Sequence, residues 1–334
     1  MVEVSLLNAP RITVVGSYAT GLTMRVERLP SPGETVLGTG YRVDYGGKGS
    51  NQAVGCARLG ARVSFVARIG KDAFGEMALK LYREEGIDLA HVTQSAGAPT
   101  GVGFIIVDAS GNNCITIDPG ANELLTAADI SQGECAFDSA EVVLTQLEIP
   151  LAAAAAAMAC GRARAAVTIL NPAPVRSLTD SVLRLVDILT PNQSEARVLA
   201  GRGPDEVIDP EEVARELIRR GVKQVVMTMG EEGAMIVTAS STRRVPALRL
   251  TAVDTTGAGD AFNAGLAMAL ACGASIEDAV QFAVVNGGLA VTKEGVIPSL
   301  PHRNEVLRCY RQGGLNPPDW FPNDSWVKDS WGGD

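Results

Sequence analysis

Short apolar runs alternate with amphipathic helical stretches along most of this 334-residue chain. The β-branched and aliphatic runs that predict buried strands lie at 11–17, 63–67, 141–145, 166–170, 188–189 and 224–228. Helical periodicity fills the segments between them, for example 74–85 and 210–220, and a glycine follows each of these two helices. Strands that alternate with helices predict an α/β fold with a doubly wound, mostly parallel sheet.

Two segments depart from this rhythm. Residues 18–45 and 100–122 alternate apolar and polar side chains in short pieces, and turns rich in glycine, proline and asparagine separate the pieces. In the second segment, 102–107 and 114–117 read as the two strands of a hairpin. Alternation of this kind predicts a small antiparallel sheet with one solvated face, separate from the main sheet.

Residues 1–312 show no linker and no internal repeat, so we predict one α/β domain over this range. The last stretch, 313–334, differs because it holds all three tryptophans and three prolines without any period. Two interpretations remain open for it. It is a tail that lies on the surface or is disordered, or its tryptophans anchor a partner subunit.

Charge and cysteine usage narrow the classes of function. The net charge is −9 and no long basic run occurs, which argues against nucleic acid or an anionic membrane as the main partner. The longest apolar run, around 151–160, is too short to span a bilayer, and the N-terminus lacks a signal-peptide layout. Six scattered cysteines without a Cys-x-x-Cys motif predict a reduced, cytoplasmic chain rather than a zinc site or a disulfide framework.

The stretch 253–265 carries the most specific chemistry. Three glycines surround Asp260, and an apolar helical pattern follows. If Asp260 opens that helix, the free N–H groups of residues 257–260 form an anion site at the positive end of the helix dipole. A carboxylate there can accept a proton from an alcohol that attacks a phosphate. The alternative is that Asp260 is only a helix N-cap.

The stretch 46–51 (Gly-Gly-Lys-Gly-Ser-Asn) precedes another predicted helix. It is not a P-loop, because the Gly-Lys-Ser or Gly-Lys-Thr ending of that motif is absent. It places Lys48 and Asn51 against a polyhydroxylated ligand or a phosphate, or it is a turn with an exposed lysine.

Two further motifs follow strand ends. In 190–195 (Thr-Pro-Asn-Gln-Ser-Glu), the spacing puts Asn192 and Glu195 on one face of a starting helix. They form a capping arrangement, or they control a hydrated Mg²⁺ carried by ATP. In 227–233, a strand ends in a glycine-rich turn, which either contacts a nucleotide or simply turns the chain.

These motifs occur in the same order as in the ribokinase (PfkB) family of carbohydrate kinases, which the chain resembles over about residues 10–308. The resemblance implies the doubly wound fold with a β lid over the sugar, often a homodimer clasp. It implies an ATP-dependent kinase that transfers the γ-phosphate to a primary hydroxyl of a pentose or related small sugar. A nucleoside kinase of the same fold and a catalytically silent ligand sensor remain as alternatives.

The resemblance also implies roles at matching positions. Asp260 matches the catalytic base, and the anion hole before it comprises Gly257, Ala258 and Gly259. The positions that match sugar contacts are Gly47, Lys48, Asn51 and Glu148. The positions that match nucleotide contacts are Asn192, Glu195, Thr228, Gly230 and Gly233, with Glu195 also holding Mg²⁺ through water. The positions that match a potassium loop are Asp254, Thr256, Ala290, Lys293, Gly295 and Ser299.

One departure from the family pattern concerns the sugar. After the first strand, ribokinase-like sequences usually carry Asn-x-Asp, whose polar groups hold sugar hydroxyls, and this chain has Ala19 and Gly21 at those places. Losing a hydrogen bond to a charged group costs about 1.5–3 kcal/mol. We therefore expect weak discrimination in favour of ribose, and a substrate that lacks a hydroxyl or is bulkier at that end.

Overall fold

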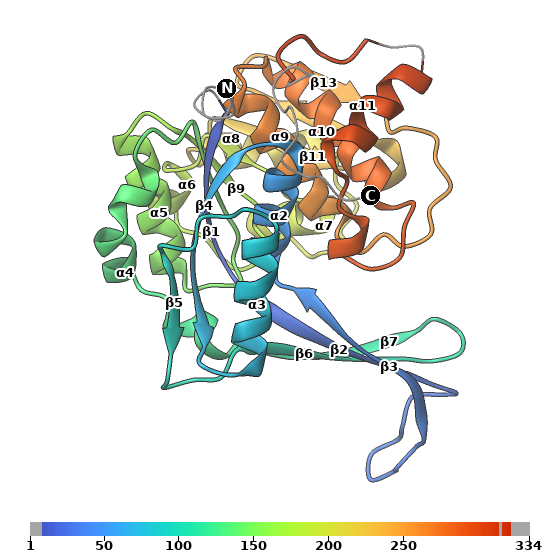
Figure 1. Cartoon of the computed structure of the whole chain (residues 1–334). Coiled ribbons are helices and arrows are strands. Elements are labelled where there is room, and N and C mark those ends of the chain that lie inside the picture. Colours follow the sequence, from blue (N-terminus) through green and yellow to red (C-terminus); the bar gives the residue numbers. More distant parts are fainter. Residues whose placement is uncertain (1–8, 314–315, 322–334) are drawn as a thin grey trace.

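The computed structural model describes residues 9–313 and 316–321, and within them the chain forms two sheets of different size (Figure 1). The larger sheet has nine strands in the order β13-β12-β11-β10-β9-β8-β1-β4-β5. The strands from β5 to β11 pair in parallel, whereas β12 and β13 form an antiparallel edge. The predicted mostly parallel sheet is confirmed. Its strands are β1 (Arg11–Val15), β4 (Arg62–Gly70), β5 (Val92–Ser95), β8 (Val142–Thr145), β9 (Val167–Leu170), β10 (Ile188–Leu189), β11 (Gln224–Thr228), β12 (Ala234–Val237) and β13 (Thr242–Val245).

Helices cover both faces of this sheet because successive strand residues point to opposite sides. Val14 and Phe65 belong to one hydrophobic cluster, while their neighbours Val15 and Val66 belong to the other. The first cluster is completed by α2 (Lys48–Leu59), α3 (Ala73–Glu84), α9 (Ala258–Ala271), α10 (Ile276–Ala290) and α11 (Arg303–Gln312). The second is completed by α4 (Ala127–Gln132), α5 (Leu151–Ala163), α6 (Asp180–Leu183), α7 (Gln193–Leu199) and α8 (Pro210–Arg219).

The smaller sheet projects from one end of the main sheet (Figure 1) and is called the lid here. Its strand order is β3-β2-β6-β7, formed by β2 (Ala19–Val26), β3 (Gly38–Gly46), β6 (Gly101–Val107) and β7 (Asn113–Asp118). The two outer pairings are antiparallel, but the central β2–β6 pairing is parallel, so the prediction of a wholly antiparallel lid was wrong in this respect. Both β2 and β6 run outward from the main sheet, which makes them parallel to each other.

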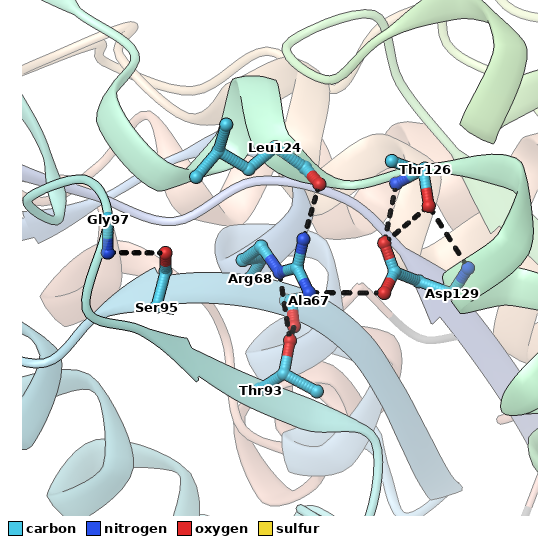
Figure 2. Close-up of polar contacts among 8 residues, drawn as sticks. All are labelled: Ala67, Arg68, Thr93, Ser95, Gly97, Leu124, Thr126 and Asp129. Carbon is cyan, nitrogen blue, oxygen red and sulfur yellow. Dashed lines mark hydrogen bonds and ion pairs between the residues drawn. The ribbon is translucent and has the colours of Figure 1, made fainter.

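Arg68 ties the root of the lid to the main sheet (Figure 2). It lies near the end of β4 and donates to the carbonyl oxygen of Leu124 at 2.6 Å, at the end of the 3-10 turn η1 (Gly120–Leu124) that follows β7. Its other terminal nitrogen lies 3.1 Å from Oδ1 of Asp129, and Asp129 forms a capping box with Thr126 at the start of α4. The segment that leaves the lid is therefore fixed to the core sheet.

The described part of the C-terminal stretch packs against α10. The ring centroids of Trp320 and Phe321 lie 5.3 and 4.6 Å from that of Phe282, and Phe321 is only 2% exposed. Trp326 and Trp331 lie outside the described residues. Among the described helices, none combines the length and apolar character that a membrane span requires.

Candidate active site

Asp260 lies in the first turn of α9, which packs against β1, β8 and α2, the helix that directly follows the lid strand β3. The helix begins after Gly257, whose φ of 82° lies in the left-handed region that favours glycine. A Cβ at Gly257 would also lie 2.8 Å from Cγ1 of Val296, so the turn needs glycine for space as well. Gly257, Ala258 and Gly259 thus precede Asp260 at the positive end of the helix, as the sequence predicts.

The carboxylate of Asp260 is buried, with 5% exposure, and side chains of α2 hold both of its oxygens. Asn51 Nδ2 donates to Oδ2 at 2.8 Å, and Gln52 Nε2 donates to Oδ1 at 2.9 Å. The residue at the N-cap position is Gly257, and no side chain caps the helix there. The interpretation of Asp260 as a simple N-cap is therefore wrong, because its oxygens are directed to another helix.

Further buried amide side chains hold in place the Gln52 side chain that donates to Asp260. Gln52 also donates to Asn171 Oδ1 at 3.2 Å and accepts a hydrogen bond from Gln146 Nε2. Asn171 in turn donates to the carbonyl oxygen of Thr190 at 3.1 Å. Sequence reasoning missed the part that Gln52 and Gln146 play, since an amide inside an apolar helix or after a strand carries no periodic signal.

Lys48 opens α2, and it lies near three carboxylates rather than on an exposed turn. Burial would lower the pKa of its ammonium, but the negative charges of Asp260, Glu148 and Glu195 outweigh that effect and raise the pKa above its ordinary value. The backbone N–H of Lys48 donates to Glu148 Oε2 at 2.8 Å, and Ser17 Oγ donates to the same oxygen at 2.6 Å. The structure thus brings these predicted sugar-site residues together with Asp260.

Asn192 and Glu195 form a complete capping box at the start of α7. Asn192 Oδ1 accepts from the backbone N–H of Glu195 at 2.8 Å, and Glu195 Oε2 accepts from that of Asn192 at 2.9 Å. The capping interpretation is confirmed, and it leaves a half-buried carboxylate facing Lys48. Burial raises the pKa of Glu195, and the nearby charge of Asp260 adds to the rise.

The predicted nucleotide turn follows β11. Thr228 ends that strand, forms a parallel bridge with Asn192, and donates its backbone N–H to Pro191 at 2.9 Å. Gly230 begins the 3-10 turn η3 (Gly230–Glu232), and Gly233 follows it. This turn therefore follows the carboxyl end of β11 directly, next to the capping box that Thr228 bridges.

The two segments of the predicted potassium loop are in contact. The carboxylate of Asp254 accepts from the backbone N–H groups of Thr256 at 2.9 Å and Gly295 at 3.0 Å. Burial would raise the pKa of Asp254, but these donors outweigh burial and lower it. Lys293 directs its ammonium away from the loop, to Glu305 Oε1 at 2.5 Å.

The other residues of this loop close it. Ala290 is the last residue of α10, and its carbonyl oxygen accepts from the backbone N–H of Lys293 at 3.3 Å. Ser299 ends the 3-10 turn η4 (Ile297–Ser299). Arg58 donates to the carbonyl oxygens of Ile297 at 2.6 Å and Leu300 at 3.1 Å, which fixes this turn against the end of α2.

Asn122 is a further residue that sequence reasoning missed, after Gln52 and Gln146. It lies in η1 and is 2% exposed. Its Oδ1 accepts from the backbone N–H of Tyr18 at 3.0 Å, and its Nδ2 donates to the carbonyl oxygens of Tyr18 and Pro119, both at 2.8 Å. Asn122 thus joins the point where the chain enters β2 to the point where it leaves β7.

Comparison with known proteins decides the family. Residues 9–303 match the family described as pfkB family carbohydrate kinase, which is most of the chain. The chain belongs to this family. The match confirms the predicted family, and the chain is an ATP-dependent carbohydrate kinase.

Individual relatives of this pfkB kinase agree with the assignment. The ribokinase of Haemophilus influenzae is 36% identical over 296 residues, which cover 89% of this chain and 97% of that protein. The deoxyribokinase of Salmonella typhi is 33% identical over 300 residues, covering 89% of this chain and 98% of that protein. The structure of Arabidopsis thaliana ribokinase complexed with ribose and ATP has a TM-score of 0.85 at 31% identity, covering 90% and 98% of the two chains. The roles of individual residues stay predictions.

Proposed function

We propose that this kinase transfers the γ-phosphate of ATP to a primary hydroxyl of a pentose or related small sugar, with Asp260 as the base. The observation that carries the proposal is the position of this carboxylate. It lies in the first turn of α9, and the amides of Asn51 and Gln52 hold both of its oxygens. A carboxylate held in this way is oriented before the substrate arrives.

The start of α9 supports a role in stabilising negative charge. The first N–H groups of a helix lack partners in the helix itself, and the dipole places positive potential there. We assign Gly257, Ala258 and Gly259 to this role beside Asp260, and the N–H of Ala258 also donates to the carbonyl oxygen of Thr255 at 3.2 Å. Since phosphoryl transfer depends mainly on positioning and on charge stabilisation, a carboxylate is adequate as the base.

On the sugar side, we propose Gly47, Lys48, Asn51 and Glu148 as contacts. The charge on Lys48 lies among Asp260, Glu148 and Glu195, so a ligand placed there meets both hydrogen-bond donors and acceptors. This mixture suits hydroxyl groups, which both donate and accept. The names of the ribokinase and deoxyribokinase relatives support a sugar of the pentose class.

We propose that Mg²⁺ enters with ATP and that the Glu195 carboxylate orients it through water. Asn192, Thr228, Gly230 and Gly233 would then contact the nucleotide, because Asn192 shares the capping box with Glu195 and bridges Thr228, and the turn with Gly230 and Gly233 follows Thr228 directly. Carboxylates and waters are ligands that Mg²⁺ prefers, and the half-buried Glu195 fits that preference. The ion would neutralise charge on the transferring phosphate.

For potassium, the donor set fits a large monovalent cation held by backbone oxygens. Asp254 draws the two segments of the loop together, and the segments that carry Thr256, Ala290, Gly295 and Ser299 offer carbonyl oxygens near the start of α9. Lys293 contributes backbone only, since its ammonium is paired with a glutamate. An ion bound there would add positive charge close to the anion hole.

The lid supports a homodimer as the proposed assembly. Its strands expose large apolar side chains, which are Met24, Tyr41, Phe104, Ile115 and Ile117. A concentration of exposed apolar residues on one sheet is typical of an interaction surface. We also propose a cytoplasmic location, because all six cysteines are free thiols, as a reducing compartment would keep them.

An ADP-release assay over pentoses, deoxy sugars, hexoses and nucleosides tests this proposal, run with and without K⁺. We expect turnover with a pentose or deoxypentose, activation by K⁺, and a rise in melting temperature when K⁺ alone is added. Turnover only with nucleosides would replace the proposed substrate. Sugar binding without ADP release would indicate a silent sensor.

A further inference from the structure

The lid turns one face of its sheet toward the catalytic residues. Along β3, Arg42 and Asp44 lie on the same face, because they are two residues apart. Arg42 Nη1 lies 2.8 Å from Glu294 Oε1, in the segment that carries the proposed cation loop beside the start of α9. The face that carries Arg42 and Asp44 is therefore the inner face of the lid.

Gly21 and Asp44 are direct cross-strand neighbours on this inner face. The register of β2 and β3 pairs them, and two residues farther in, Ala19 pairs with Gly46 at the root of the lid. A Cβ built at Gly21 would lie 3.8 Å from the Cβ of Asp44. Two side chains at such a pair reach into the same space. Gly21 adds no side chain to that space, Asp44 places a carboxylate next to it, and Cδ1 of Ile105 borders it at 3.7 Å from the built Cβ.

The carboxylate of Asp44 is accessible to solvent, and its ion pair within the protein is weak. Its ion pair with Arg42 is long, with Nε 3.5 Å from Oδ2, because the guanidinium is drawn to Glu294 at the shorter distance. The side chain of Asp44 is 44% exposed. A carboxylate in this condition can accept hydrogen bonds from a ligand without breaking a strong internal contact.

We propose that Asp44 is a specificity-determining residue that accepts hydrogen bonds from sugar hydroxyls remote from the phosphorylated one. The carboxylate that the family pattern leads one to expect at position 21 is supplied instead from the strand opposite. This inference rests on the proposed sugar kinase function and names the substrate more closely. The preferred sugar carries a hydroxyl at this end, with Asp44 as its acceptor.

The proposal reverses the expectation that the sequence alone suggests. Ala19 and Gly21, read by themselves, predict weak preference for a sugar with hydroxyls at that end. The partner of Gly21 across the ladder, Asp44, lies 23 positions farther along the chain, and only the register of β2 and β3 brings it alongside. A site with a charged acceptor discriminates strongly against an analogue that lacks the matching hydroxyl, because the acceptor is then left unpaired.

Three variants test the proposal. Asp44→Asn and Asp44→Ala remove the charge, and the double variant Gly21→Asp with Asp44→Ala returns it from the opposite strand. An added Cβ at Gly21 makes contacts no closer than 3.7 Å, so the swap fits sterically. The matched control is Glu27→Gln, which changes a carboxylate to an amide on the exposed far part of the lid.

Each variant is assayed for kcat/KM with D-ribose, 2-deoxy-D-ribose and 3-deoxy-D-ribose, for KM of ATP, and for the rise in melting temperature with each sugar. We expect Asp44→Asn to lower kcat/KM for ribose by about 10- to 100-fold. At least one deoxy sugar, the one that lacks the contacted hydroxyl, should change by less than about threefold, since it makes no such contact. The KM for ATP should stay unchanged. The double variant Gly21→Asp with Asp44→Ala should recover part of the preference for ribose that Asp44→Ala loses.

An equal loss with all three sugars, or a swap no better than Asp44→Ala, would overturn the role of Asp44 while leaving the kinase activity established. A wild-type enzyme that releases ADP with nucleosides but with no sugar would overturn the proposed function, and this inference with it. The Glu27→Gln control should behave as wild type, and a matching loss there would assign the effect to lid charge in general.

Discussion

Gln52 lies at the centre of the buried amide network, so its removal tests whether that network holds the catalytic carboxylate. It donates to Asp260 Oδ1 at 2.9 Å and to Asn171 Oδ1 at 3.2 Å, and it accepts from Gln146 Nε2. The change Gln52→Leu keeps the approximate volume of the side chain and removes all three hydrogen bonds at once.

The cost follows from the three buried groups that lose a partner. Each buried group left unsatisfied costs about 1–3 kcal/mol, and a charged group such as Asp260 costs more. Burying the apolar leucine returns about 2 kcal/mol. Three groups at that cost, less the return from the leucine, give an expected net fall of about 1–7 kcal/mol in the free energy of unfolding. Turnover should fall about 10- to 100-fold, because Asp260 keeps only the hydrogen bond from Asn51 and is less well positioned.

Urea unfolding and the ADP-release assay measure the two effects, and Gln94→Leu is the matched control. Gln94 is exposed and donates to Glu76 Oε1 at 2.8 Å, so its loss should change stability by less than about 0.5 kcal/mol. If Gln52→Leu were as stable and as active as wild type, the amide network would have no part in holding Asp260, and the reasoning would be refuted.

Three further changes probe the start of α9, the root of the lid and the partly buried carboxylate of Asp187. Gly257→Ala should lower the free energy of unfolding by about 1–3 kcal/mol and abolish most turnover, as measured by urea unfolding and ADP release. Its control is Gly273→Ala, because Gly273 has a similar φ of 81° and open space around it, and this variant should keep its activity. Asn122→Ala should lower the melting temperature and raise the KM for sugar but not for ATP, while the exposed Asn112→Ala should do neither. For Asp187→Asn, the loss in melting temperature should be full at pH 7 and vanish in acid.

The sign of the last effect follows from the pKa of Asp187. Burial would raise that pKa, but the ammonium of Lys223 and the hydrogen bonds from Thr168 outweigh burial and lower it. The stabilisation is therefore present above the unfolded pKa of about 3.9 and is lost as pH falls through the folded value. If the melting-temperature difference between Asp187→Asn and wild type grew in acid, this sign would be wrong. If Asn122→Ala and wild type had equal KM values for sugar, the role given to Asn122 would be wrong.

The sequence predicted those features that repeat or that cluster locally. Short β-branched runs predict the buried strands, and glycines next to a helix start predict the motif around Asp260. The same local signal failed to separate alternatives at Asn192 and Glu195, where a cap and a ligand site use the same two residues. The structure shows that the cap exists, and a role with Mg²⁺ is compatible with it.

The remaining features depend on contacts between distant positions. Gln52 and Asp260 are 208 residues apart, and Asn122 and Tyr18 are 104 apart, so no window of sequence contains either pair. The parallel pairing of β2 with β6 was missed for a similar reason, because alternation predicts a strand but not its direction. The strand register that places Asp44 opposite Gly21 likewise follows from the fold and cannot be predicted from the local sequence pattern.

The central claim is that Asp260 takes the proton of the sugar hydroxyl, and the variant Asp260→Asn tests it most directly. Asn51 Oδ1 is buried without a hydrogen-bond partner, so a flip of that amide lets it accept from the new side chain and the fold should be kept. With saturating ATP and the best sugar, we expect the rate of ADP release to fall by about 10²–10⁴-fold at an unchanged melting temperature. Turnover close to wild type in a folded Asp260→Asn enzyme would contradict the account.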